Sequence, residues 1–270
     1  MSLVSKRPAY AARAHVFARR LLLAALLSLP AAPALAAHVS ESLAAGDSAY
    51  AAFSLSTALD HYRAALAADT ASFAALWRLA RVESELGEDS SGEAQRRLIS
   101  SAVAHARTAV KLAPDSALGH VWLAVALGRQ ALKEGPKTRL ALSREIKSEV
   151  DRAIQLDPAV GRAWHALAMW NRKIASLNTL ERMAANTVLG GVPKGASMEN
   201  AVSDFQKAIE LEPGYVNHRL ELGRTYMDLK RWGDARTELE KAASLPPTSN
   251  PRDPRYQQEA RELLAKLPKR

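Results

Sequence analysis

The chain of 270 residues contains no cysteine, and this absence excludes disulfide bonds, thiolate zinc sites, cysteine nucleophiles and a cysteine-linked lipid anchor. Aromatic residues make up only 6% of the chain. Much of the apolar content is instead alanine and leucine, which favour helices over sheets because they lose little side-chain freedom in a helix. With 48% hydrophobic and 24% charged residues, the composition excludes a wholly disordered chain and a membrane protein with many spans.

The net charge of +9 is unevenly distributed along the chain. Residues 1–36 contain five basic residues and no acid, which leaves +4 for residues 37–270. A nucleic-acid binder gathers its lysines and arginines on one face, whereas a charge of +4 over this length is dilute. We therefore expect no nucleic-acid partner.

The first 36 residues have the order of a secretory signal peptide. A basic, acid-free segment (1–20) precedes an apolar run (21–29), and the segment ends in the small-residue motif Ala34-Leu35-Ala36. Cleavage after Ala36 would leave a secreted or periplasmic chain with no membrane span, since the run is shorter than the roughly 20 residues that cross a bilayer. Two alternatives remain open: an uncleaved membrane anchor and an arginine-rich mitochondrial transit peptide.

The remainder of the chain repeats itself. Five segments share an alanine, an apolar position and a nearby aspartate or proline, and their first alanines are Ala65, Ala109, Ala153, Ala208 and Ala242. These alanines are 44, 44, 55 and 34 residues apart. The last spacing is the period of a two-helix repeat of about 34 residues, and the other spacings indicate lengthened units.

The last unit, residues 216–249, resembles the tetratricopeptide repeat. Its matching residues are Leu222, Gly223, Tyr226, Ala235, Leu239, Ala242 and Pro247. Arg219 stands where the family usually has tryptophan. The resemblance and the spacing predict an all-α, right-handed superhelical solenoid of about five helix hairpins over residues 37–270, closed by a capping helix at Pro254–Leu267.

The apolar pattern also predicts where the helices lie. The first helices of the earlier hairpins are expected at Ser72–Leu86, Ala117–Leu132 and Val160–Leu177. The second helices are expected at Leu55–Ala68, Glu93–Leu112, Leu140–Leu156, Met198–Leu211 and Gly233–Leu245. Each hairpin alone buries too little apolar surface, so stacking has to supply the core.

A long middle stretch carries a closer resemblance. It includes 172–175, 181–184 and 193–205, and 77–81 and 146–158 lie upstream. Over about 45–265 the chain resembles the regulator of microtubule dynamics family. The resemblance implies a helical-repeat fold with lengthened units and a binding-scaffold role. Eukaryotic members are associated with microtubules and mitochondria, but the secretory signal points to another compartment, so we carry over the fold and the scaffold role without the partner.

No catalytic, cofactor or metal motif is present in the sequence. The histidines form no H-x-x-x-H pair, and no serine lies in a G-x-S-x-G elbow. The first alternative to a scaffold is an extracytoplasmic enzyme with a site in the 178–200 insertion, whose candidate residues are Asn178, Glu181, Lys194 and Glu199. The second is a structural protein that only self-associates, and a homo-oligomer is possible in either case.

The first helices of a helical-repeat solenoid line its concave groove. Projection of the helical period places twelve partner-binding residues there: Trp77, Arg81, His120, Arg162, His165, Met169, Arg172, Lys173, Asn217, Leu220, Arg224 and Met227. This set contains no acid, which predicts a basic groove for a protein or peptide partner with an acidic or carboxyl-terminal segment.

The sharpest hypothesis is a clamp in which Arg162, Arg172, Lys173 and Arg224 bind a carboxylate of the partner, since guanidinium groups bind carboxylates through two parallel hydrogen bonds. The alternative is that these arginines pair with acids of neighbouring second helices, with Glu145, Glu149, Glu181 and Glu199 as candidates.

Overall fold

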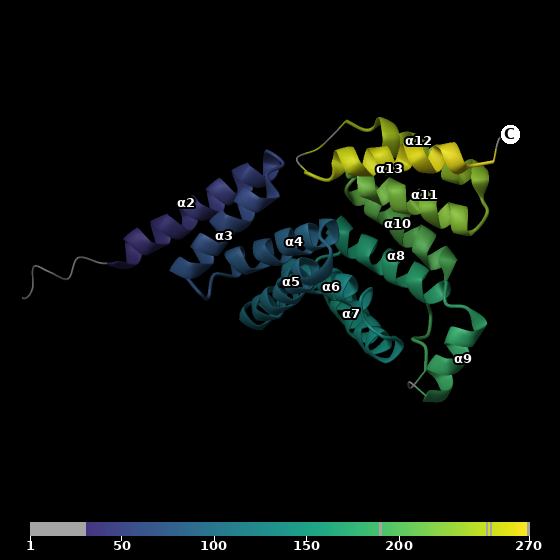
Figure 1. Cartoon of the computed structure of the whole chain (residues 1–270), viewed down its shortest axis with the longest axis horizontal. Helices are drawn as coiled ribbons and strands as arrows, with labels where there is room; N and C mark the ends of the chain where they lie inside the picture. The colour runs from purple at the N-terminus through teal and green to yellow at the C-terminus, as the bar shows by residue number, and fades with distance from the viewer. Residues whose placement is uncertain (1–30, 189–190, 247, 249, 269–270) are drawn as a thin grey trace, which may run out of the picture.

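The computed structural model describes residues 31–188, 191–246, 248 and 250–268. This part of the chain contains twelve helices and no strand (Figure 1). The helices are α2 (Ala31–Ala51), α3 (Leu55–Ala68), α4 (Phe73–Asp89), α5 (Gly92–Leu112), α6 (Ala117–Ala131), α7 (Pro136–Leu156), α8 (Gly161–Ala175), α9 (Thr179–Val188), α10 (Met198–Leu211), α11 (Val216–Asp228), α12 (Trp232–Ser244) and α13 (Asp253–Lys266).

The helices pair into five antiparallel hairpins. The pairs are α2 with α3, α4 with α5, α6 with α7, α8 with α10, and α11 with α12, and α13 packs on α12 and α11. The first helices α4, α6, α8 and α11 also contact one another in that order, so they form the inner layer of the stack. The predicted all-α solenoid of five hairpins with a capping helix is confirmed.

Small residues let the two helices of a hairpin approach closely. A methyl group at Gly223 would lie 2.7 Å from Cγ of Leu239, on the partner helix of the same hairpin. Ala235 and Ala242 beside this crossing have no exposed surface. The small consensus residues of the last unit therefore occur where α11 and α12 are too close for larger side chains.

The two units with a spacing of 44 residues owe most of their extra length to their second helices, whereas the unit with a spacing of 55 owes it to the insertion that contains α9. Both α5 and α7 have 21 residues, whereas α12 has 13. Helix α7 begins at Pro136, four residues before the predicted start at Leu140. Proline is favoured at the first helical position because its fixed φ suits a helix and its missing N–H would have no partner there.

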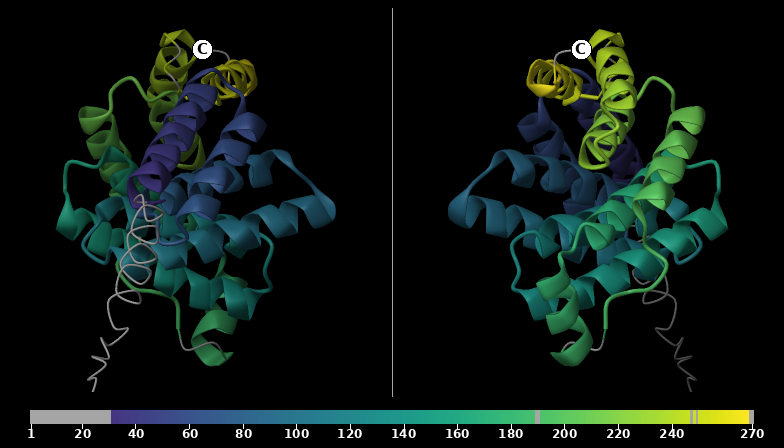
Figure 2. Two further views of the ribbon diagram at one scale, coloured as in Figure 1. Left: turned by 90° about the vertical axis from the view of Figure 1, so that its left-hand side faces the viewer. Right: turned by 90° about the vertical axis from the view of Figure 1, so that its right-hand side faces the viewer.

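Two helices, α2 and α9, were not predicted. Helix α2 runs without a break past Ala36, the predicted cleavage position. Residues 1–30, most of the predicted signal peptide, lie outside the described residues, as does Pro247. None of the described helices is both long enough and apolar enough to cross a membrane. Helix α9 lies in the 178–200 insertion and stands at the lower edge of the molecule in both views of Figure 2.

Candidate functional site: a chamber on the inner face

A cavity of about 840 Å³ lies on the inner face of the solenoid, between α6, α8 and α11. The start of α7, helix α9 and the capping helix α13 complete its wall. We call this cavity the chamber. Its larger apolar side chains come from α6, α7, α8, α9 and the turns beside them: Val125, Leu132, Leu140, Ile146, Met169, Trp170, Ile174, Leu177 and Leu180. Its volume is within the range of ligand-binding pockets, roughly 300–1,000 Å³.

Half of the predicted groove residues line the chamber: His165, Met169, Arg172, Lys173, Asn217 and Arg224. Leu220 does not, because it is fully buried in the core of the last hairpins, and Met227 packs against the same core. On α11 the chamber face consists of Asn217, Glu221 and Arg224. Leu220 precedes Glu221 by one residue, which is about 100° round the helix. The predicted set was therefore wrong by one position on α11, and it contained Leu220 where the chamber wall has Glu221.

Three further predicted residues have partners outside the chamber wall. The guanidinium of Arg81 lies 3.7 Å from the ring centroid of Tyr50 and 5.2 Å from that of Trp77. His120 is buried, and its Nδ1 lies 2.6 Å from a carboxylate oxygen of Glu149. His120 thus joins α6 to α7, which is a packing role within a hairpin.

The arginines of the predicted clamp already bind carboxylates of the protein. Arg172 donates to Glu221 at 2.8 Å and to Asp228 at 2.7 Å. Arg224 donates to the other oxygen of Glu221 at 3.0 Å and to Glu259 at 2.6 Å. Glu221 therefore lies between two arginines of successive inner helices. The partners of Arg172 and Arg224 belong to α11 and α13, not to the second helices considered as the alternative.

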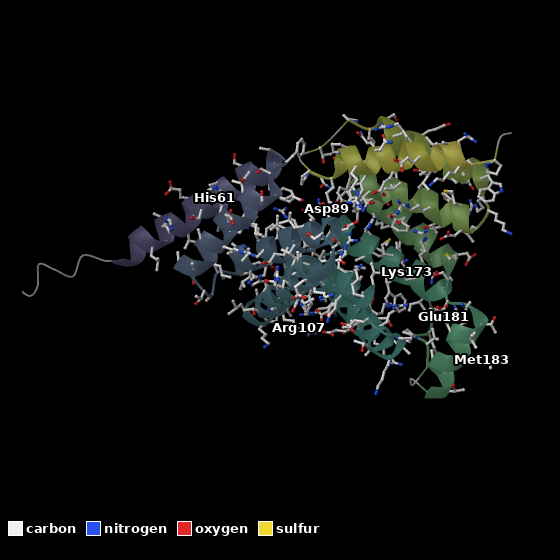
Figure 3. The ribbon with its side chains drawn as sticks, viewed as in Figure 1. His61, Asp89, Arg107, Lys173, Glu181 and Met183 are labelled. Atoms are coloured by element: carbon white, nitrogen blue, oxygen red, sulfur yellow. The ribbon has the colours of Figure 1, made fainter. Side chains whose placement is uncertain are left out.

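The prediction of a groove with one sign of charge is wrong. Four acids contribute to the chamber wall: Glu88, Glu181, Glu221 and Glu259. Lys173 is an exposed cation of the wall, and no carboxylate within the described part of the chain pairs with it. It is labelled in Figure 3 near the end of α8. Lys173 is thus the member of the predicted clamp whose charge is available to a ligand.

Arg162 lies beyond the inner end of the chamber in a polar cluster. Its guanidinium is 4.5 Å from the ring centroid of Tyr215 and 3.6 Å from a carboxylate oxygen of Glu212. Nδ1 of His165 and Nδ1 of His218 are 2.9 Å apart. Burial lowers the pKa of both histidines, and the positive charge of Arg162 lowers each further. The imidazoles therefore favour their neutral forms, in which one ring donates to the other.

The start of the capping helix closes this end of the solenoid. Arg252, only 3% exposed, donates from Nη1 to Asp89 at 2.9 Å and to the backbone carbonyl of Glu85 at 3.0 Å. It also lies 3.2 Å from Glu88, and Arg255 pairs with Asp89. We call these contacts the latch. Asp89 is labelled in Figure 3 near the start of α13. No repeat or motif in the sequence indicated these pairs.

The four candidates for an enzyme site in the insertion do not converge. Asn178 and Glu181 form a capping box at the start of α9, since each side chain accepts a 2.9 Å hydrogen bond from the other's backbone N–H. Lys194 lines a separate cavity of about 220 Å³ together with Asp204, whose pKa burial raises to about 6. Glu199 is exposed in the first turn of α10.

Comparison with solved structures defines the class of protein. A thermophilic tetratricopeptide-repeat protein from Thermus thermophilus superposes with a TM-score of 0.63 and 19% sequence identity, and the match covers 84% of this chain and 99% of that protein. Together with the stacked hairpins and the inner-face chamber, this likeness defines a helical-repeat solenoid of the tetratricopeptide type.

The particular family follows from sequence comparison. The family model of regulator of microtubule dynamics proteins 1–3 matches residues 42–268. Protein 1 of this name from Caenorhabditis elegans is 31% identical over 191 residues, covering 71% of this chain and 84% of that protein. Protein 3 from Rattus norvegicus is 33% identical over 190 residues, and the match covers 70% of this chain and 40% of the rat protein's length. The chain belongs to the regulator of microtubule dynamics family.

Proposed function

We propose that this protein is a non-catalytic interaction scaffold that binds a segment of a protein partner in the chamber. The observation that carries the proposal is the chamber itself, which combines an apolar wall with charged side chains on the inner face of a repeat solenoid. The apolar wall offers pockets for side chains of an extended segment. Of the four insertion residues of the rival enzyme hypothesis, Asn178 and Glu181 cap α9 and Lys194 lines a separate cavity, which favours the scaffold.

The partner segment that suits this chamber carries a carboxylate beside apolar side chains. Lys173 supplies the charge, because Arg172 and Arg224 are held by Glu221. Met169 lies one turn before Lys173 on the same wall and adapts to apolar groups of varied shape. An acidic side chain or a terminal carboxylate would meet Lys173 while its neighbouring apolar residues contact α6 and α8.

The site of action proposed here is outside the cytoplasm. The support is the basic segment, apolar run and small-residue ending of residues 1–36. The relatives are named for the regulation of microtubule dynamics. A secreted or periplasmic chain would use the same fold for a different partner, and we therefore propose the scaffold role without a microtubule partner.

The test is titration with a library of fluorescent peptides that end in a free carboxylate, each with an amidated twin. For peptides that bind, Lys173→Ala should weaken the free-carboxylate form about tenfold, the effect of losing one charge-assisted hydrogen bond, and leave the amidated form unchanged. Lys111→Ala, on α5 outside the chamber wall, is the matched control. Substrate turnover that is lost in Lys194→Ala would instead support an enzyme, and light scattering across concentration would detect pure self-association.

A second candidate ligand is an elongated amphipathic small molecule. The favouring observation is the volume of about 840 Å³ with large aliphatic side chains along three helices, a cavity able to enclose an apolar chain. A fluorescent fatty acid such as cis-parinaric acid tests this candidate directly. Ala166→Trp would fill part of the chamber and should abolish the fluorescence increase of cis-parinaric acid on binding. Ala104→Trp, on the exposed face of α5, should leave that increase unchanged.

A further inference from the structure

Large apolar side chains are exposed at one end of the chamber. Leu180 and Met183 of α9 are 75% and 60% exposed, and Leu132, which follows α6, is 53% exposed. Leu132 and Leu180 also line the chamber, so the apolar surface continues from its wall to the outside. Leu180 and Met183 are three residues apart and therefore share one face of α9. We call this end of the chamber the mouth.

Helix α9 is fixed by its opposite side. Arg182 donates to the backbone carbonyls of Ile174 at 2.8 Å, Ala175 at 2.9 Å and Leu177 at 3.1 Å, which ties α9 to the end of α8. The capping box described above fixes its first turn. In Figure 3 the labelled Met183 lies at the outer edge of the molecule. The exposure of its apolar face is thus a consequence of how α9 is anchored.

Cations lie on the other two segments that border the mouth, which are the turn from α6 to α7 and the end of α8. Four basic side chains lie at the mouth or in the turn that leads to it: Lys133, Lys137, Arg139 and Lys173. All four are exposed, and none pairs with a carboxylate of the residues that the structure describes. The nearby acids are Glu134 and Glu181, and the carboxylate of Glu181 accepts the backbone N–H of Asn178.

We propose that the mouth docks on an anionic lipid surface. Leu180 and Met183 insert at the boundary between headgroups and acyl chains, and the four cations lie over the phosphates. A projecting apolar helix face with cations beside it suits an anionic lipid surface, because lipids rearrange around an inserted side chain. A protein partner would instead need a groove whose shape is complementary to this face. This inference goes beyond the scaffold role, since peptide binding inside the chamber requires no membrane.

The absence of cysteine makes a site-specific test simple. The full chains carrying Met183→Cys or Leu112→Cys are each labelled with the polarity-sensitive dye NBD. Leu112 is also an exposed apolar residue, at the end of α5 and outside the chamber wall, so it serves as the matched control. Vesicles of phosphatidylcholine alone are compared with vesicles containing phosphatidylglycerol. We expect the NBD emission at position 183 to shift to the blue with the anionic vesicles and not with phosphatidylcholine alone. The emission at position 112 should not shift with either.

Flotation with the same vesicles measures the affinity for the lipid surface. The double variant Leu180→Glu with Met183→Glu should reduce this affinity at least tenfold, and each of Lys137→Glu and Lys173→Glu should reduce it at least fivefold. Leu112→Glu should have no effect. Residues 21–29 form an apolar run that could itself bind vesicles. Flotation therefore supports docking at the mouth only when the dye at position 183 also shows a blue shift.

Three outcomes would overturn the proposal. Equal responses at 183 and 112 would assign any membrane binding to another part of the chain. No response at 183 with anionic vesicles would exclude insertion of α9. A blue shift at 183 that grows with protein concentration in the absence of lipid would show that a second copy of the chain covers this face. Circular dichroism of the charge variants, including the single lysine changes, checks that the helical fold is intact.

Discussion

Arg252 and Asp89 lie 163 residues apart in the chain, yet Nη1 of Arg252 is 2.9 Å from Oδ2 of Asp89. The arginine stands just before the capping helix, and the aspartate ends the first helix of the second hairpin. Their contact joins the start of the capping helix to α4 of the second hairpin. The buried side chain of Arg252 also donates a hydrogen bond to a backbone carbonyl of α4.

The first prediction concerns this latch. Arg252→Ala should lower the free energy of unfolding by about 1–3 kcal/mol, because it removes the hydrogen bonds of a buried guanidinium to a half-exposed carboxylate and to a backbone carbonyl. Urea unfolding followed by circular dichroism measures the change. The control is Arg255→Ala, whose side chain is 47% exposed, and its cost should stay below about 1 kcal/mol. Similar costs for the two variants would mean that burial of Arg252 contributes little.

The second prediction concerns the crossing of α11 and α12. Gly223→Ala should destabilise the fold by about 1–3 kcal/mol, since the added methyl group would overlap Leu239. Gly128→Ala is the control in α6, where nothing lies within 4 Å of the added atom. It should stabilise the protein by about 0.5–1 kcal/mol, because alanine has the higher helix propensity. Thermal unfolding of both variants shows whether each substitution raises or lowers the stability. A stabilising effect of Gly223→Ala would contradict the close crossing of α11 and α12.

The third prediction is a loss of stability in weak acid. The folded-state pKa values of His165 and His218 lie below the ordinary value of about 6.5. Below that pH the unfolded chain binds more protons, so the free energy of unfolding falls as the pH drops from about 7.5 to 5.5. His165→Leu should flatten this dependence in urea unfolding measured at each pH. An unchanged slope would show that the histidine pair does not carry it.

Asp204 contributes with the opposite sign and needs its own control. Its pKa is about 6 in the folded state against 3.8 as the ordinary value. Between these pH values the folded chain binds the extra proton, which adds stability as the pH falls. Asp204→Asn should therefore steepen the acid loss that the histidines cause. The comparison is made in the His165→Leu background as well, where the remaining slope is due to other groups.

The fourth prediction concerns Glu221, which holds Arg172 and Arg224. Glu221→Gln should remove the carboxylate that Arg172 and Arg224 share and leave each with one acidic partner, Asp228 or Glu259. The chamber then gains net positive charge, so acidic peptides should bind about tenfold more tightly, while the fold loses about 1–3 kcal/mol. Fluorescence anisotropy with a free-carboxylate peptide measures the affinity. Glu238→Gln, which removes the partner of Arg219 outside the chamber wall, is the matched control. A weaker or unchanged affinity in Glu221→Gln would contradict the chamber as the peptide site.

Much of the helical layout follows from local sequence. The bounds of α3 and α10 agree with the prediction to the residue, because each ends where the apolar period stops and an Asp or a Glu-Pro pair begins. Helices α2 and α9 were not predicted because they carry no repeat alanine and proline. The start of α9 is defined by a capping box that lies in a stretch with no repeat partner.

The chamber was predictable only in part. Met169, Arg172 and Lys173 line it as expected, since one helical face of α8 extends through them. Glu221 was missed because a shift of one residue on α11 exchanges a core position for a chamber position, and periodicity alone does not define a face more finely than that.

The sequence by itself determined the class of fold: alanine and leucine favour helices, the spacing of the repeat alanines defines the hairpins, and Gly223 and Ala235 mark where helices cross. Only the tertiary structure decided that Arg252 meets Asp89, that Glu221 pairs with two predicted clamp arginines, and that the face of α9 stays exposed. The physical reason is that each repeat contacts its neighbours in a pattern that local sequence encodes. The meeting of distant ends instead depends on small rotations between repeats, which accumulate along the stack.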